Sequence, residues 1–228
     1  MIKETSACVI LFLRAPRKGK VKTRLAKTLG DDTVLALYKF FVIDVLQAVE
    51  RTGFPVVIYF DPDDAEDELR NWLDISHDMH PQIGTDLGEK MDHAFRETFS
   101  FGFLRSVLIG TDCPHIRPEI IETAQQNLTE SDMVIGPSFD GGYYLIGFRK
   151  DTFSQSVFQH LPWGTETVLE KTLEICEKKG LSVKKLPGLQ DIDTLDDLKS
   201  FYREKNKQPH TPEYSATLSY LSSIQFQA

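Results

Sequence analysis

The fold of this 228-residue chain is decided by the run Ala7-Cys-Val-Ile-Leu-Phe-Leu13 and the segment after it, Arg14-Ala-Pro-Arg-Lys-Gly-Lys-Val-Lys-Thr-Arg24. The first part is unbroken and apolar, which predicts a strand buried on both faces, as in a parallel sheet covered by helices. The second part is rich in lysine and arginine and predicts a loop at the end of that strand. In open α/β sheets, ligands bind at the carboxyl edge, where such loops lie.

Short apolar runs alternate with longer helical patterns along the rest of the chain. Residues 31–52 carry apolar side chains on one helical stripe, and residues 106–110 form another apolar run typical of a buried strand. Strands separated by helices predict an α/β fold with three layers and a mostly parallel central sheet. We expect one domain over residues 1–204 and a C-terminal extension over 205–228.

Composition argues against several classes of protein. The formal net charge is −8, which disfavours binding to nucleic acid or to an anionic membrane. The three cysteines form no C-x-x-C pair, so neither a disulfide framework nor a zinc site is expected. The first apolar run is too short to span a bilayer, and no signal peptide precedes it. We therefore expect a cytoplasmic protein without a membrane span or a nucleic-acid partner.

The basic loop after the first strand is a candidate phosphate-binding segment. Lysine suits phosphate as a mobile point charge, and arginine can contact two phosphate oxygens at once. Gly19 permits close approach of the backbone to a ligand. The alternative is a solvated basic loop, because charge runs are usually solvated. The segment lacks the pattern of a Walker A loop. The candidate nucleotide-binding residues of this loop are Arg14, Pro16, Gly19, Lys22 and Arg24.

Two aspartates are candidate metal ligands. Asp112 follows the apolar run 106–110, where an unpaired carboxylate would be costly to bury. A bound Mg²⁺ or Mn²⁺ would offset that cost, since hard cations bind carboxylate and phosphate oxygens together. Alternatively, Asp112 caps a turn before Pro114. Asp193 belongs to a short D-x-D pattern, and the next residues, Thr194 to Asp197, resemble a helix-capping box.

Two glycine-containing segments are weaker candidates. Asp140 precedes two glycines, so it either lines the acceptor side of a site or belongs to a hairpin turn. Gln82, Gly84 and Thr85 could contact a nucleotide base through hydrogen bonds and close backbone approach. The alternative for that segment is a loop before the start of a helix.

Several motifs in order resemble one bacterial family. They are F-L-R-A-P-R-K-G-K-V-K-T-R-L (12–25), G-T-D-C-P (110–114), G-P-S-F-D-G-G-Y-Y-L-I-G (136–147), L-P-W-G-T (161–165) and D-I-D-T-L-D-D-L (191–198). The chain is similar over roughly residues 6–201 to GT-A-like transferases that are provisionally named nucleotide-diphospho-sugar transferases and have no assigned reaction. Arg117 departs from the family, which commonly has Ser or Thr before the proline.

The resemblance implies the GT-A fold of glycosyltransferases and of nucleotidyltransferases acting on sugar phosphates or molybdenum-cofactor precursors. It implies that Lys22 and Arg24 contact phosphate, that Asp112 binds a metal, and that Asp193 is the second metal ligand.

We expect a metal-dependent transferase with a nucleotide or nucleotide-sugar donor, Mg²⁺ or Mn²⁺ as cofactor, and an unidentified small-molecule acceptor. Lys22, Arg24 and Asp140 are the candidate catalytic residues. Glycosyl transfer and nucleotidyl transfer, which releases pyrophosphate from a nucleoside triphosphate, both stay open. So does a non-catalytic, nucleotide-binding regulatory domain. The oligomeric state also stays open, with a homodimer as one option.

Overall fold

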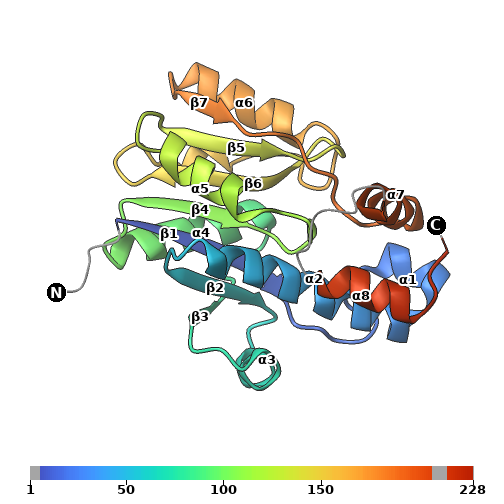
Figure 1. Cartoon of the computed structure of the whole chain (residues 1–228). Coiled ribbons are helices and arrows are strands. Elements are labelled where there is room, and N and C mark those ends of the chain that lie inside the picture. Colours follow the sequence, from blue (N-terminus) through green and yellow to red (C-terminus); the bar gives the residue numbers. More distant parts are fainter. Residues whose placement is uncertain (1–5, 207–214, 228) are drawn as a thin grey trace.

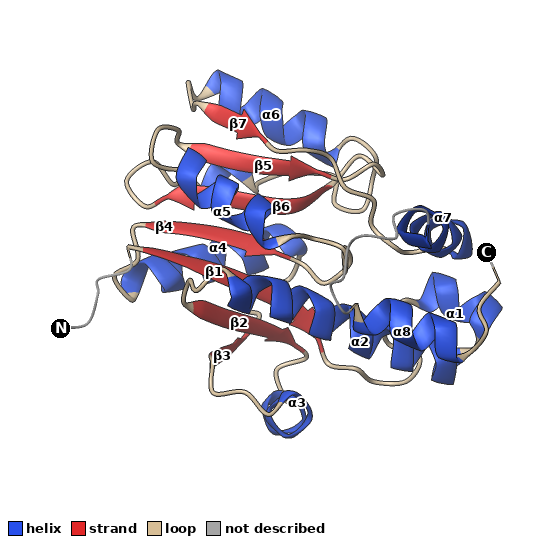
Figure 2. Cartoon of the chain, viewed as in Figure 1, coloured by secondary structure: helices blue, strands red, loops and turns tan. Residues whose placement is uncertain are grey.

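A computed structural model describes residues 6–206 and 215–227 of the chain, which fold around one central sheet (Figure 1). The strands are β1 (Ala7–Arg14), β2 (Val56–Asp61), β3 (Asp78–Pro81), β4 (Arg105–Ile109), β5 (Met133–Pro137), β6 (Tyr143–Arg149) and β7 (Val183–Lys185). Their order across the sheet is β3-β2-β1-β4-β6-β5-β7 (Figure 2). Strand β6 pairs antiparallel with β4 and β5, and the other neighbours pair parallel. The predicted mostly parallel sheet is confirmed.

Helices cover both faces of this sheet. One face packs against α2 (Asp31–Arg51), α3 (Glu66–Leu73) and α5 (Pro118–Asn127). The other packs against α4 (Leu87–Ser100), α6 (Val168–Lys178) and the short 3₁₀ helix η1 (Gln155–Val157). Figure 1 shows the resulting layers of helix, sheet and helix, so the predicted three-layer α/β fold is confirmed. Within the described residues, no helix combines the length and the apolarity needed to cross a bilayer.

Strand β1 shows why its sequence is apolar without interruption. Side chains of successive strand residues point to opposite faces of a sheet. Val9 and Leu11 belong to the core beneath α2, whereas Cys8 and Ile10 belong to the core beneath α4. All four are fully buried. Because helices cover both faces, β1 has no face on which a polar side chain would meet water.

A third core lies beside the sheet and includes the C-terminal helix. Helices α1 (Thr23–Leu29), α7 (Leu195–Asn206) and α8 (Ala216–Ser223) pack there with α2, burying Leu25, Phe41, Leu198 and Leu221. Asp44 of α2 is buried and accepts hydrogen bonds at the start of α8, including one of 2.7 Å from the backbone nitrogen of Ala216. Residues of the predicted extension therefore contribute to a core that they share with the preceding helices.

Helix α1, strand β3 and the 3₁₀ helix η1 were not predicted, whereas one predicted turn is confirmed. The basic segment ends in helix α1, so Arg24 is helical. Strand β3 has only four residues and ends in proline, which left no alternating pattern to detect. The turn at Asp140-Gly-Gly joins β5 to β6, with a 3.1 Å bond from the nitrogen of Ser138 to the carbonyl oxygen of Gly142. Gly141 adopts a φ of 89°, a conformation that favours glycine.

Candidate functional site

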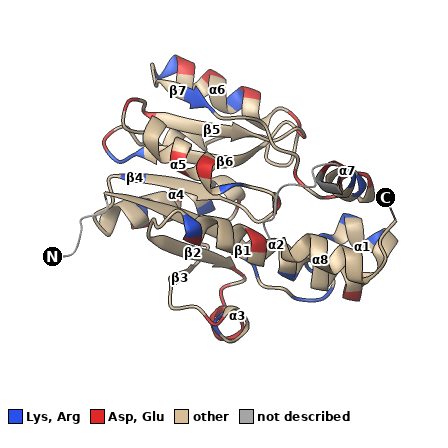
Figure 3. Cartoon of the chain, viewed as in Figure 1, with Lys and Arg blue, Asp and Glu red and all other residues tan. Residues whose placement is uncertain are grey.

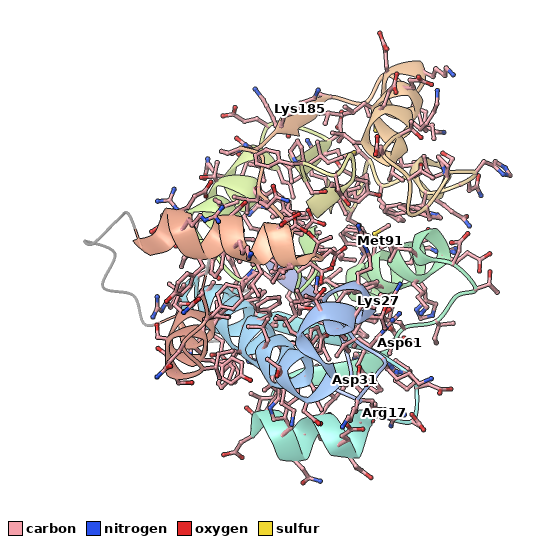
Figure 4. The ribbon with its side chains drawn as sticks, turned by 90° about the vertical axis from the view of Figure 1, so that its right-hand side faces the viewer. Arg17, Lys27, Asp31, Asp61, Met91 and Lys185 are labelled. Carbon is pink, nitrogen blue, oxygen red and sulfur yellow. The ribbon has the colours of Figure 1, made fainter. Side chains whose placement is uncertain are left out.

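A cavity of about 450 Å³ lies at the carboxyl edge of the parallel strands. This edge is on the right in Figure 1 and faces the viewer in Figure 4, where Asp61 and Met91 of the cavity wall are labelled. Charged residues occur mainly on helices and at strand ends (Figure 3). The residues that line the cavity are Phe12, Leu13, Arg14, Val21, Lys22, Thr23, Arg24, Tyr38, Asp61, Gln82, Leu87, Met91, Leu108, Gly110, Thr111, Asp112, Tyr143, Tyr144, Leu145, Ile146 and Asp193.

The first charged feature of this cavity is the lysine-centred cluster, which consists of Lys22, Asp112 and Asp193. The Nζ of Lys22 lies 2.5 Å from Oδ1 of Asp112 and 2.6 Å from Oδ1 of Asp193. The lysine side chain is only 5% exposed, whereas that of Asp112 is 57% exposed. Arg24 lies farther out, with Nη1 3.9 Å from Oδ2 of Asp193. The ammonium is therefore buried beside two carboxylates that are themselves partly exposed, and all three residues line the cavity.

Three loops bring this cluster together. Lys22 precedes α1 in a left-handed conformation with φ of 44°. Asp112 follows β4, and its carbonyl oxygen accepts a 3.0 Å bond from the backbone nitrogen of Ile192, which ties the two aspartate loops together. The predicted capping box is confirmed, because Thr194 Oγ1 donates to Asp197 at 2.7 Å and accepts from its backbone nitrogen at 3.3 Å. This box holds the backbone next to Asp193.

The charge of Lys22 is maintained by its two partners. Burial lowers the pKa of the lysine, because a low-dielectric environment disfavours the ammonium. The negative charges and hydrogen bonds of Asp112 and Asp193 outweigh burial, so the net effect raises the pKa above its ordinary value. Lys22 is consequently a buried cation at neutral pH.

The second charged feature is the aspartate-centred cluster, formed by Asp61, Arg14 and Lys90. Oδ2 of Asp61 lies 3.2 Å from Nε of Arg14, and Oδ1 lies 3.0 Å from Nζ of Lys90. Sequence reasoning identified Arg14 but missed Asp61 and Lys90. The available signal was an aspartate directly after the second apolar run, at the edge where Asp112 follows its own strand.

Tyr38 is another cavity residue that was missed. Its hydroxyl donates to the carbonyl oxygen of Arg14 at 2.9 Å and accepts from the backbone nitrogen of Arg14 at 3.0 Å. Thr111 donates to the same hydroxyl at 3.4 Å. Tyr38 thereby links the ends of β1 and β4. Nothing in its helical sequence pattern distinguishes it from an ordinary core residue.

The predicted site residues fall into two groups. The structure brings together, as cavity-lining residues, Arg14, Lys22, Arg24, Gln82, Asp112 and Asp193. Those outside the cavity lining are Pro16, Gly19, Gly84, Thr85 and Asp140. The three basic residues predicted to bind nucleotide and the two predicted metal ligands thus share one cavity. Their roles stay predictions.

Gln82 and Thr85, which were predicted to contact a base, make hydrogen bonds within the protein. Nε2 of Gln82 donates to the carbonyl oxygens of Leu13 and Tyr59, at 3.3 and 3.0 Å, and so holds the ends of β1 and β2 together. Thr85 donates through its backbone nitrogen and its hydroxyl to Glu89, at 2.8 and 2.7 Å, just before α4. These bonds lower the pKa of Glu89. The alternative interpretation, a loop before a helix start, describes the local structure.

Asp140 is exposed at the turn between β5 and β6. Its Oδ1 accepts hydrogen bonds from the hydroxyl of Ser138 and from the backbone nitrogen of Gly142, the latter at 3.0 Å. Burial raises the pKa of Asp191 to about 6, and the negative charge of Asp140 adds to that rise. The observed contacts of Asp140 are those of a turn residue.

The donor set for a metal consists of two carboxylates. Among the described residues, no group of three or more His, Cys, Asp and Glu side chains is placed to hold a metal ion. Asp112 and Asp193 nevertheless converge on one cationic atom. Magnesium in nucleotide sites commonly takes one or two carboxylates, with phosphates and water completing its octahedron. The pair therefore suits a cation shared with a phosphate ligand. Nearby, Oδ1 of Asp191 is buried without a hydrogen-bond partner in the described part of the chain.

Solved structures show the same architecture. A structure from Desulfovibrio desulfuricans G20, provisionally designated a nucleotide-diphospho-sugar transferase, matches with a TM-score of 0.91 and 39% identity, covering 96% of this chain and 95% of the other. A 4-diphosphocytidyl-2C-methyl-D-erythritol synthase from Anaerococcus prevotii has a TM-score of 0.58 and 12% identity, with coverage of 89% and 99%. A cytidylyltransferase from Leptospira borgpetersenii has a TM-score of 0.54 and 15% identity, with coverage of 96% and 94%. The last two share the fold alone.

The family follows from sequence. No curated protein matches the chain. Residues 44–165, more than half of the chain, match the family described as "Uncharacterized protein conserved in bacteria (DUF2064)". Because this match agrees with 39% identity over nearly the whole Desulfovibrio chain, the protein belongs to the DUF2064 family.

Proposed function

We propose that this protein is a metal-dependent transferase with a nucleotide or nucleotide-sugar donor. In this proposal the diphosphate of the donor binds at the lysine-centred cluster, where Lys22 and Arg24 contact phosphate oxygens. Asp112 and Asp193 would hold Mg²⁺ or Mn²⁺, which the same phosphates could also bind. The bound metal would supply positive charge that stabilises developing negative charge on phosphate oxygens.

One observation carries the proposal. Two carboxylates from distant loops meet at one buried cation, at the carboxyl edge of an α/β sheet and in the wall of a cavity. Bringing like charges together is unfavourable unless a cation lies between them. The cavity volume also falls within the usual range for small-molecule sites, roughly 300–1,000 Å³.

Glycosyl transfer is the first candidate reaction. An acceptor hydroxyl would attack the anomeric carbon of the sugar, the bond from that carbon to phosphate oxygen would break, and the nucleoside diphosphate would leave. The acceptor proton passes to a base or to solvent. Lys22 and Arg24 would stabilise the departing diphosphate. The 39% identical Desulfovibrio protein, with its provisional designation, supports this candidate.

Nucleotidyl transfer is the second candidate, and the number of cations at the cavity favours it. Arg14, Lys22 and Arg24 all line the cavity, which suits the longer charged chain of a triphosphate. An acceptor oxygen would attack the α-phosphorus of a nucleoside triphosphate, and the bond to the β-phosphate oxygen would break and release pyrophosphate.

The test begins with binding. The protein is heated with each of a panel of nucleoside triphosphates and nucleotide sugars, with and without Mg²⁺ or Mn²⁺. A ligand that binds the folded state raises the melting temperature as its concentration exceeds Kd. We expect stabilisation that needs both nucleotide and metal. Absence of stabilisation by every nucleotide, with either metal, would contradict the proposal.

Product analysis then separates the two reactions. With water as the acceptor, slow release of a nucleoside diphosphate from a nucleotide sugar supports glycosyl transfer. Release of pyrophosphate from a triphosphate supports nucleotidyl transfer. The Asp112→Asn protein is the control for contaminating hydrolases. Metal-dependent binding without any turnover would instead favour the non-catalytic nucleotide-binding domain.

A further inference from the structure

The position of Lys22 bears on the order in which ligands bind, and this inference rests on the proposed function. The ammonium contacts one oxygen of each predicted metal ligand, at 2.5 and 2.6 Å. A divalent ion bound by both oxygens would need to occupy the same space. We propose that Lys22 is an internal counter-ion, which keeps divalent metal out of the Asp112–Asp193 pair until a phosphate-bearing ligand draws the lysine away.

Because Lys22 is buried, a divalent metal ion without phosphate should compete poorly with its ammonium for Asp112 and Asp193. The Lys22 side chain is 5% exposed, and its ammonium lies 6.0 Å from the ring centroid of Phe41. A metal ion that took both carboxylates would leave this ammonium buried without an anionic partner, which is strongly unfavourable. The metal and the ammonium would also repel each other.

A phosphate group changes this balance, because it offers the ammonium a new anionic partner. The two carboxylates are reachable from the cavity side, since Asp112 is 57% and Asp193 38% exposed. The flexible four-carbon stem of lysine allows its ammonium to move from carboxylate to phosphate oxygen. Metal and phosphate ligand would therefore bind together, each favouring the other.

The charges around the pair agree with this role. Lys22 and Arg24 carry two positive charges, which equal in number the two negative charges of Asp112 and Asp193. The two cations therefore offset much of the attraction that the carboxylate pair would have for a dication, although Asp191 adds a further negative charge beside Asp193. Removing Lys22 would leave the pair with Arg24 as its one remaining ion-pair partner among the described residues, and such a pair should attract Mn²⁺ directly.

The experiment measures binding of Mn²⁺ without any nucleotide, by the loss of the electron paramagnetic resonance signal of free Mn²⁺. The proteins are wild type, Lys22→Met and Lys20→Met. Lys20 lies in the same loop and is exposed, so its variant controls for the change in net charge. We expect Lys22→Met to bind Mn²⁺ at least about tenfold more tightly than wild type, and Lys20→Met to change binding less than about twofold. Inorganic pyrophosphate should increase the Mn²⁺ held by wild type, beyond the Mn²⁺ that pyrophosphate binds in a sample without protein.

The outcomes separate this inference from the proposed function. Tight Mn²⁺ binding by wild type without pyrophosphate would overturn the counter-ion role and leave the metal-dependent transferase standing; this measurement needs no variant. Unchanged or weaker Mn²⁺ binding by a folded Lys22→Met protein would do the same. If no protein binds Mn²⁺ even with pyrophosphate, both the counter-ion role and the metal site of the proposed function are wrong.

Discussion

The two charged clusters at the sheet edge have opposite composition. In the lysine-centred cluster, Lys22 is shared by two carboxylates, whereas in the aspartate-centred cluster, Asp61 is shared by Arg14 and Lys90. The first group has one more negative than positive charge, and the second has one more positive than negative. One edge of one sheet thus carries a cluster with an excess of negative charge and, at neighbouring strands, a cluster with an excess of positive charge.

The largest expected effect is on metal dependence. Asp112→Asn should reduce metal-dependent nucleotide affinity by about a hundredfold, because losing a charged ligand costs on the order of 2–3 kcal/mol. Titration calorimetry with and without Mg²⁺ measures the change. The matched variant is Asp61→Asn in the other cluster, for which we expect less than about a threefold change in metal dependence. Equal losses in the two variants would contradict the distinction between the clusters.

The next largest effect is expected on the affinity for the phosphate groups of a nucleotide. Lys22→Ala should weaken nucleoside diphosphate or triphosphate binding by about ten- to a hundredfold, because a charge-assisted contact is lost. Binding of the corresponding nucleoside should change little. Calorimetric titrations with nucleoside and nucleotide provide the comparison, and Arg24→Ala should act in the same direction. A variant that loses nucleoside and nucleotide affinity equally has lost structure, and its result would count against a direct phosphate contact.

A smaller effect is expected from a residue that holds the backbone next to Asp193 but does not itself bind metal or phosphate. Thr194→Ala removes the hydroxyl that caps α7 through Asp197, and should cost about 0.5–2 kcal/mol of stability. Urea denaturation measures this loss. Metal-dependent affinity should fall much less than in Asp112→Asn, because both carboxylates and Lys22 remain. A loss of affinity as large as that of Asp112→Asn would show that the cap itself determines the geometry of Asp193.

The smallest effect is expected at the aspartate-centred cluster. Lys90→Met leaves Asp61 paired with Arg14, and a partly exposed ion pair contributes only about 0–1 kcal/mol. The melting temperature should therefore change by a few degrees at most, and metal dependence should not change. A drop in nucleotide affinity as large as that of Lys22→Ala would show that the two clusters bind phosphate equally.

Much of this arrangement could be predicted from sequence, for a physical reason. An apolar run followed by a polar loop identifies a parallel strand and its ligand edge, so Asp112 and the basic loop were expected at one place. The capping pattern at Thr194 separated Asp193 from Asp197 correctly, because a cap depends on residues only three apart.

Other features depend on contacts between residues far apart in the sequence, which a local sequence pattern does not predict. Lys22 was expected to contact phosphate, but its position between Asp112 and Asp193 depends on three loops that converge after folding. The aspartate-centred cluster requires β2 to lie beside β1 and α4 to lie over that edge. The antiparallel direction of β6 also depends on its neighbours, since a short apolar run has the same composition in either direction.

The C-terminal helix has a consequence for engineering. Helix α8 packs in the same core as α1, which begins beside Lys22, and α7, which begins beside Asp193. A segment outside the family motifs thus shares a core with the helices that follow two of the three loops of the lysine-centred cluster. Shortening the protein before residue 215 would remove α8 from this core, together with its contacts to Phe40 and Asp44 of α2, and we expect it to loosen both loops. Hydrogen exchange at residues 22–26 and 192–198 would reveal that loosening, which would make the tail a means of tuning ligand affinity without altering a residue in the cavity.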